Sequence, residues 1–295
     1  MSMHRPPTMD PVAAQRWSQQ VAQESPWLHE EVARRMEDRL QWIVRQPASW
    51  LHWEPLRGGI QVHDSLVRRY PNAQCTVQEG TSAHLLSARR KLQQPWWTAA
   101  RWKGQRTEFA LQSKPVQMLW ANMALHMQAD PEALIQAWHS ALETDGFLMF
   151  SCLGPDSLRE LRMLYAALGW PAPSHDFTDM HDWGDMLVHA GFAEPIMDME
   201  HITLSYSRGE TLLAELRSMG RNLHPQRFAG LRTRHWRQQL CLALEQHLRG
   251  VDGRLRLTFE VIYGHAFKPL ARMPVRSETR VALDDLRQRL RKGNR

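Results

Sequence analysis

The amino-acid sequence predicts an α/β protein built on a mostly parallel sheet with helices on both faces. Four short apolar runs suit buried strands, at 50–53, 74–78, 116–122 and 147–152. Helical patterns alternate with strands along the chain, which is typical of parallel sheets that are covered on both faces. The chain has 295 residues, 43% of them hydrophobic, and this is enough for one large core or one core with a modest subdomain.

The first predicted helix begins at Ser25-Pro26, because proline favours the first turn of a helix. Apolar residues then recur at helical spacing and should pack on the body of the protein: Leu28, Val32, Met36, Leu40 and Ile43. Pro47 ends this helix, and the strand at 50–53 follows. A second helix is predicted at 62–70, between the first two strands.

In the second half of the chain, Asp130 is expected to cap a helix at 131–142 that has Pro131 at its first position. Asp145-Gly146 makes the turn into the strand at 147–152. The remaining predicted elements are a helix at 180–189 that ends at Gly191 in a left-handed cap, a strand at 196–206, a largely helical block at 209–249, a strand at 254–267 and a short helix at 282–290.

The cysteines and the hydropathy exclude several classes of protein. Cys75, Cys152 and Cys241 lie far apart, with no C-x-x-C pair and no histidine at zinc-ligand spacing, so we expect buried free thiols in a reducing compartment and no metal site. No apolar run approaches the roughly 18 residues that cross a bilayer. The opening MSMHRPPTMD lacks the apolar stretch of a secretory signal. We therefore expect a cytoplasmic protein that does not enter the membrane.

Positive charge is concentrated in two segments. Residues 268–295 carry nine Lys or Arg against three acids, and residues 208–237 carry seven Arg against two Glu. Such faces attract acidic partners, although a solvated helix surface with scattered arginines would look the same. A nucleic-acid partner ranks last, because a basic tail serves any polyanion.

A ligand is expected at the carboxyl ends of the strands, where parallel sheets bind them. The loop after the strand at 50–53 contains Gly58 and Gly59, which allow backbone to approach a ligand, or which simply form a strand-to-helix turn. Glu79 follows the second strand. It is either an acceptor for a ribose diol or an ordinary glutamate before a turn.

Four segments together resemble one enzyme family. They are WANMALHM at 120–127, GFLMFSCLGPDSLRELR at 146–162, DMHDWGDMLVHAGFAEPIMDMEHITLSY at 179–206 and FEVIYGHAF at 259–267. In this order and spacing they resemble the class I, S-adenosylmethionine-dependent methyltransferases. Within that class they are most similar to the malonyl-acyl-carrier-protein O-methyltransferases of biotin synthesis. The resemblance spans roughly residues 20–268.

The resemblance implies a three-layer, Rossmann-like sheet of seven strands, with a helical lid inserted before a last, antiparallel strand. The chain then divides into an N-terminal arm (1–24), a methyltransferase core with its N-terminal helix (25–207), the helical lid (208–249), the last core strand (250–268) and a basic C-terminal tail (269–295). We expect a monomer.

The resemblance also implies the substrates and the residues of the site. The family methylates the free carboxyl of a malonyl thioester on an acidic carrier protein, with S-adenosylmethionine as donor. The residues expected to bind the donor are Gly58, Gly59, Glu79, Asn122 and His126, although His126 is also interpretable as a core or surface histidine. Arg159, Arg217 and Arg221 are candidates to orient the carboxylate, and Tyr206 is expected to line the cavity. No general base is required.

The donor loop departs from the family pattern, which runs hydrophobic-Leu-Asp-hydrophobic-Gly-x-Gly-x-Gly. His52 stands at the Asp position, Glu54 and Leu56 stand at the first two glycines, and only Gly58 matches. Glu54 would face the carboxylate of the donor, an unfavourable contact between like charges. Two hypotheses follow: a methyltransferase with a divergent donor site, or a protein that has lost catalysis and serves as a carrier-protein-binding or regulatory module.

Overall fold

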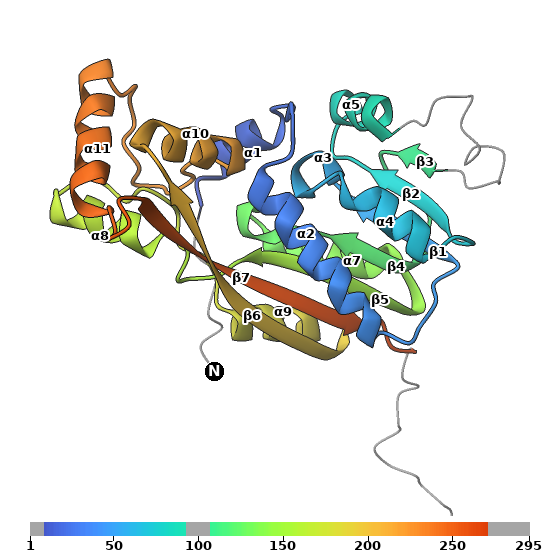
Figure 1. The fold of residues 1–295 in the computed structure, drawn as a ribbon. Helices are drawn as coiled ribbons and strands as arrows, with labels where there is room; N and C mark the ends of the chain where they lie inside the picture. Colours follow the sequence, from blue (N-terminus) through green and yellow to red (C-terminus); the bar gives the residue numbers. More distant parts are fainter. Residues whose placement is uncertain (1–8, 93–106, 271–295) are drawn as a thin grey trace, which may run out of the picture.

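Seven strands form one mixed sheet in the computed structural model, which describes residues 9–92 and 107–270 (Figure 1). The strand order is β3-β2-β1-β4-β5-β7-β6. β7 is antiparallel to both of its neighbours, and the other pairs are parallel. The strands are β1 (Ser49–Trp53), β2 (Gln74–Gln78), β3 (Thr107–Ala110), β4 (Val116–Ala121), β5 (Leu142–Leu153), β6 (Ala193–Tyr206) and β7 (Leu255–Phe267). The predicted α/β architecture and its antiparallel last strand are confirmed.

Helices cover both faces of the sheet and form two hydrophobic clusters. One cluster lies under α2, α4 and α5 and continues beneath α8, α10 and α11; the other lies under α7 and α9. The helices are α1 (Pro11–Ser18), α2 (Trp27–Arg39), η1 (Leu40–Trp42), α3 (Pro55–Gly58), α4 (Val62–Arg69), α5 (Ser82–Leu92), η2 (Leu125–Met127), α7 (Pro131–Ser140), α8 (Arg159–Ala167), α9 (Met180–His189), α10 (Gly209–Met219) and α11 (Arg234–His247).

The predicted helix boundaries rest on the expected local chemistry. The Asp130 side chain accepts a hydrogen bond from the Ala133 N–H at 3.0 Å and so caps α7. Gly191 follows α9 with φ +96°, a conformation that favours glycine. The block at 209–249 is two helices, because residues 220–233 contain two glycines and a proline and leave the helical conformation.

The structure differs from the prediction at several elements; α5, β3 and α8 were not predicted, and β5 and the N-terminal arm differ from their expected form. The strand expected at 147–152 begins at Leu142 and includes Gly146, so the expected turn is part of β5. The N-terminal arm contains a helix, α1, whose N-cap is Asp10. Asp10 Oδ1 accepts from the N–H groups of Val12 and Ala13.

The segment expected to form a lid lies in the chain between β6 and β7. These two strands pair from Ala193↔Phe267 to Tyr206↔Leu255, and α10 and α11 follow at the far end of the pair, beside α8 (Figure 1). The helices therefore stand at one end of the sheet.

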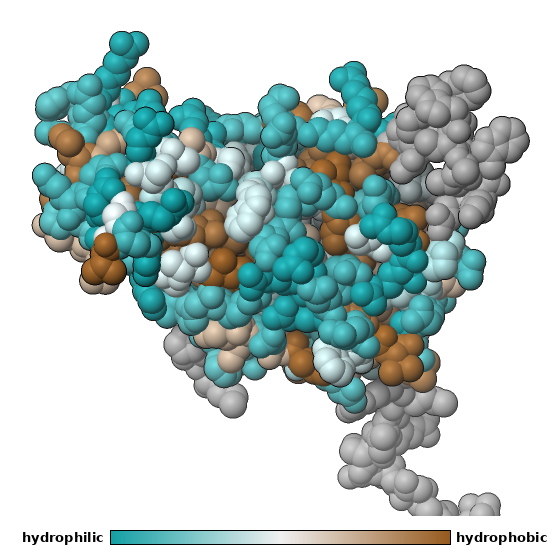
Figure 2. Space-filling view, in the orientation of Figure 1, coloured by the Kyte–Doolittle hydropathy of each residue, from teal (hydrophilic) through white to brown (hydrophobic). Residues whose placement is uncertain are grey.

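The face drawn in Figure 2 is mainly hydrophilic, and its hydrophobic side chains form separate patches. Within residues 9–92 and 107–270, no helix has both the length and the apolar character to cross a membrane. The three cysteines are free thiols; Cys75 and Cys152 are buried as expected, whereas Cys241 is only half-buried. The predicted helix at 282–290 and nearly all of the basic tail lie outside the described residues.

Candidate active site

The loop expected to hold a donor connects β1 to α4 at the carboxyl end of the sheet. Glu54 adopts φ +46°, in the left-handed region, and the four-residue helix α3 follows it. The Glu54 carbonyl accepts from the Gly58 N–H at 3.0 Å. Gly59 has φ +107°, a conformation that side chains rarely adopt, so glycine is required there.

Only glycine fits at position 58, because the backbone of the donor loop lies very close to the backbone at Asn122. A Cβ atom at this position would lie 2.5 Å from the Asn122 carbonyl oxygen. The Asn122 side-chain amide donates to the carbonyls of Gly58 and His29, and its oxygen accepts from the Ser151 hydroxyl at 2.6 Å. Asn122 therefore fastens the loop to α2 and to β5.

Replacing Gly58 by alanine should lower the free energy of unfolding by about 2 to 3 kcal/mol, because backbone must move to admit the methyl group. Gly184→Ala is the matched control, since Gly184 lies within α9 and a Cβ there meets nothing within 4 Å. This control should gain up to about 1 kcal/mol from helix propensity. Urea unfolding measures the free energy of unfolding of both variants. Equal stability of the two variants would contradict the prediction.

Glu79 follows β2 and is buried, with 2% of its surface exposed. Its Oε1 accepts from the Leu56 N–H at 3.0 Å. The pKa of Glu79 is raised to about 8, mainly by burial. Glu54 contributes to this rise, and the Leu56 N–H and Arg57 oppose it. The carboxyl expected to bind a ribose thus bonds the donor loop itself.

Arg57 lies in the same region. Its guanidinium donates to the carbonyls of Trp17 and Gln20 and lies 4.0 Å from the centre of the Trp17 ring. Desolvation lowers the pKa of Arg57, while Glu54 and Glu79 raise it. The space left beside these residues is a cavity of about 50 Å³. Its walls are formed by α1, α2, the donor loop, Glu79 and residues 122–128.

A second, larger cavity of about 630 Å³ lies beneath α10 and α11. Its apolar lining includes Leu153, Leu158, Leu161, Leu213, Leu216, Leu240 and Phe259. Five arginines also line it: Arg217, Arg221, Arg232, Arg234 and Arg237. No Asp or Glu is among its lining residues in the described ranges. This cavity suits an apolar chain that carries an anionic group.

The structure brings some of the predicted site residues to this cavity and leaves others outside. Arg217, Arg221 and His126 line it. Arg159 is exposed on α8 and pairs with Asp156 and Glu160, at 3.6 and 3.5 Å. These pairs direct Arg159 away from the cavity lining.

Tyr206 and His126 are buried polar residues at this end of the sheet. Within the described ranges, neither the Tyr206 hydroxyl nor His126 Nδ1 has a hydrogen-bond partner. Burial raises the pKa of Tyr206, and Glu215 adds to this; burial lowers the pKa of His126, and His29 and His175 add to that. His126 is therefore a neutral imidazole at pH 7.

Two glutamates that the sequence reading missed connect the segment at 154–160 to β7. Glu260, which is buried, accepts from the Asp156 N–H at 2.6 Å, and Glu160 accepts from the N–H and the hydroxyl of Thr258. Their positions in the motifs LRELR and LTFEV were the available signal. These bonds explain why the two motifs occur together.

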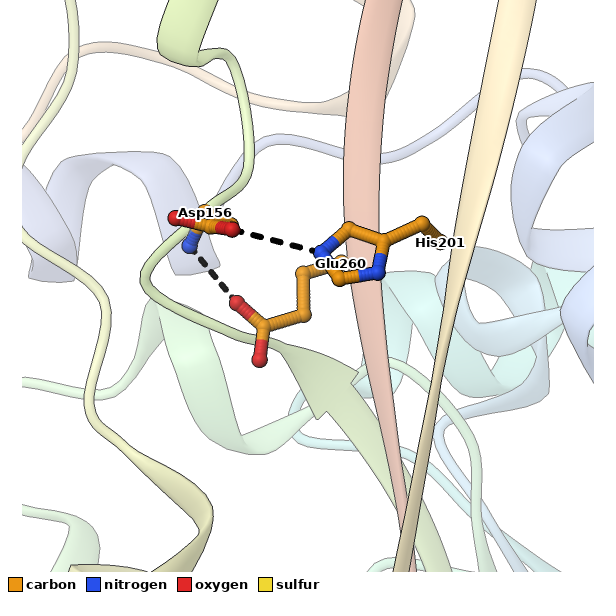
Figure 3. Close-up of side chains that lie close together, drawn as sticks. All are labelled: Asp156, His201 and Glu260. Atoms are coloured by element: carbon orange, nitrogen blue, oxygen red, sulfur yellow. Dashed lines mark hydrogen bonds and ion pairs between the residues drawn. The ribbon is translucent and has the colours of Figure 1, made fainter.

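Glu260 also belongs to a group of possible metal ligands with Asp156 and His201 (Figure 3). Their ligand atoms lie within 4.8 Å of one another. Asp156 Oδ2 contacts His201 Nε2 at 3.3 Å and the Arg159 guanidinium at 3.6 Å. The Arg159 cation thus already balances the exposed carboxylate of this group.

Curated relatives match most of the chain, although no family model does. The malonyl-[acyl-carrier protein] O-methyltransferase of Laribacter hongkongensis is 37% identical over 255 residues, which are 83% of this chain and 84% of the relative. The enzyme of the same name from Gallionella capsiferriformans is 37% identical over 261 residues, or 83% and 86%. The chain belongs to the malonyl-[acyl-carrier protein] O-methyltransferase family.

Solved structures show the same fold as this family member. A Bacillus halodurans protein provisionally described as a methyltransferase aligns with a TM-score of 0.53 at 14% identity, over 81% of this chain and 100% of that chain. The YcgJ protein of Bacillus subtilis aligns with a TM-score of 0.52 at 13% identity, over 82% and 99%. At these identities the likeness supports the fold alone.

The donor site of this family member does not fit S-adenosylmethionine in the arrangement described. Ligand sites have volumes of roughly 300 to 1,000 Å³. The cavity beside the donor loop has a volume of only about 50 Å³, and the Glu79 carboxyl accepts a hydrogen bond from the Leu56 N–H. Gly58, Gly59 and Asn122 have roles in the backbone of the loop, and their role in binding a donor stays a prediction.

Proposed function

We propose that the protein is an S-adenosylmethionine-dependent O-methyltransferase that acts on the free carboxyl of malonyl-[acyl-carrier protein]. The observation that carries the proposal is the cavity of about 630 Å³ with its apolar wall and five arginines. The family supports the choice of substrate, since both relatives described above are named for malonyl-[acyl-carrier protein]. We assign the reaction to biotin synthesis, where the methyl ester would disguise the malonyl group for elongation.

Methylation of a carboxylate makes modest demands on the side chains. The malonyl carboxylate is ionised at neutral pH and needs no general base. The protein must bind this anion, align it and exclude water. We assign the binding to Arg217, in the last turn of α10, and to Arg221, two residues after this helix; both line the cavity. Burial lowers the pKa of Arg221, and the nearby Arg217 adds to this.

We assign docking of the carrier protein to the helices between β6 and β7, residues 208–249, acting as a lid. Arg217, Arg234 and Arg237 are exposed there beside the mouth of the cavity. A positive rim steers an acidic partner and sets its orientation. A malonyl group on a carrier docked at this rim would reach the cavity below it.

The closed donor site favours a second candidate function, a carrier-protein-binding module without catalysis. Glu79, Leu56 and Arg57 fill the region that a donor would occupy. The cavity and its arginines would serve this function equally well. The two functions differ only in whether a methyl group is transferred.

Intact-mass spectrometry of malonyl-[acyl-carrier protein], after incubation with the protein and S-adenosylmethionine, separates them. We expect a slow gain of one methyl group, faster than for free malonyl-CoA because the lid contacts the carrier. Arg217→Ala with Arg221→Ala should lose this activity. No gain at saturating donor, with carrier binding intact, would select the non-catalytic module.

A further inference from the structure

We propose that Arg57 and helix α1 form an internal plug of the donor site, and that contacts between α1 and residues 208–249 hold the plug in place. The inference rests on the proposed function, because it explains how a family member has a donor site that its own side chains fill. The plug is defined by Arg57 and residues 10–20. Its release, and not a repacking of the sheet, would open the site.

Arg57 is held by contacts with the end of α1. Its guanidinium donates to two carbonyls at the end of α1, those of Trp17 and Gln20, and lies against the Trp17 ring. Glu54 and Glu79 lie close enough to raise the pKa of Arg57. Arg57, Glu54, Glu79 and Trp17 together form part of the wall of the 50 Å³ cavity. Arg57 therefore joins the donor loop to α1.

Helix α1 is in turn held by residues of the segment between α10 and α11. Asp10 Oδ2 pairs with the Arg227 guanidinium at 2.7 Å, and the Asp10 N–H donates to the Leu223 carbonyl at 2.9 Å. Arg221 lies 5.1 Å from the centre of the Trp17 ring. The Asp10 end of α1 is thus bound to Leu223 and Arg227, and the Trp17 end contacts both Arg221 and the donor loop.

Helix α1 is only weakly packed on the rest of the protein. The helix has eight residues, and Ala14 is its one buried residue. A helix this short is marginal without tertiary contacts. Few buried apolar groups place it among the segments that open most easily. An acidic carrier that pairs with Arg227 would compete directly with Asp10 for this arginine.

Calorimetric titration with S-adenosylhomocysteine tests the plug without measuring catalysis. The variants are Arg57→Ala, Trp17→Ala and Asp10→Ala, each checked for folding by circular dichroism. Asp179→Ala is the matched control, because Asp179 also caps a helix, α9, and has no contact with the plug among its hydrogen bonds in the described ranges. If the open state is a minor population, each plug variant should bind at least about tenfold tighter than wild type.

A second titration adds holo-acyl carrier protein to the wild-type chain. Carrier should strengthen S-adenosylhomocysteine binding by a similar factor, and Asp10→Ala should remove most of that gain. Tight binding by the wild type alone would overturn the proposal. So would unchanged affinity in all three plug variants combined with a gain in Glu54→Gly/Leu56→Gly, because the loop itself would then close the site. Carrier binding, measured on the same proteins, reports separately on the proposed function.

Discussion

Replacing Arg217, Arg234 and Arg237 by glutamate is expected to weaken binding of malonyl-[acyl-carrier protein] by about 100-fold or more. The three side chains are exposed on the same face of the lid, and the triple variant changes its charge by six units. Rim charges act mainly on the association rate and on its salt dependence. The wild-type affinity should accordingly fall as salt rises, and the variant should lose this dependence. Surface plasmon resonance at low and high salt measures the affinity for the carrier and its salt dependence.

The matched control reverses Arg68, Arg89 and Arg90, which are exposed on α4 and α5, far from the lid in Figure 1. It changes the net charge by the same amount and should bind the carrier within about threefold of wild type. Arg227 is left unchanged in the test because it pairs with Asp10. Equal losses in the two triple variants would mean that net charge, and not the lid face, attracts the carrier.

Glu79→Gln is expected to stabilise the protein above pH 8 and to have little effect at pH 5. The folded-state pKa of Glu79, about 8, lies above its ordinary value of 4.5, so the native state holds a proton that the unfolded state has lost. Wild-type stability therefore falls as pH rises from about 4.5 to 8. Glutamine keeps an oxygen for the Leu56 N–H and does not ionise. At about 1.4 kcal/mol per pKa unit, the difference at pH 9 should be about 2 kcal/mol or more.

Urea unfolding at both pH values measures this effect, and Glu31→Gln provides the opposite case. Hydrogen bonds from Arg34 and Arg35 lower the pKa of Glu31 to about 2, so its contribution is present above about pH 4.5 and is lost in acid. That variant should be less stable than wild type at pH 7. If Glu79→Gln has the same stability as wild type at pH 9, folding does not raise the pKa of Glu79 and the prediction is wrong.

The fold could be predicted where local chemistry and family patterns agree. Asp130-Pro131 begins α7, Gly191 follows α9 in the left-handed region, and β6 and β7 lie close to the strands predicted at 196–206 and 254–267. In each case the signal is carried by residues that are neighbours in the sequence. The caps and periods of such segments depend little on the rest of the chain.

What could not be predicted depends on residues that are distant in the sequence. Asp10-Pro11 carries the same cap signal as Asp130-Pro131, yet α1 was missed because it has only eight residues and buries only Ala14. Arg57 reads as an ordinary loop arginine, since its partner Trp17 lies 40 residues earlier. The sequence identified the loss of glycines but could not show which side chains fill the space.

The pairing of Tyr206 with Leu255 separates the evolution of the lid from that of the sheet. Residues directly opposite each other on antiparallel strands lie only about 5 Å apart, so residues 207–254 leave the sheet and return to it at almost the same point. Insertions or deletions in this segment need not change the register of β6 and β7. Residues 207–254 can therefore diverge in length and composition without a change in the pairing of the sheet.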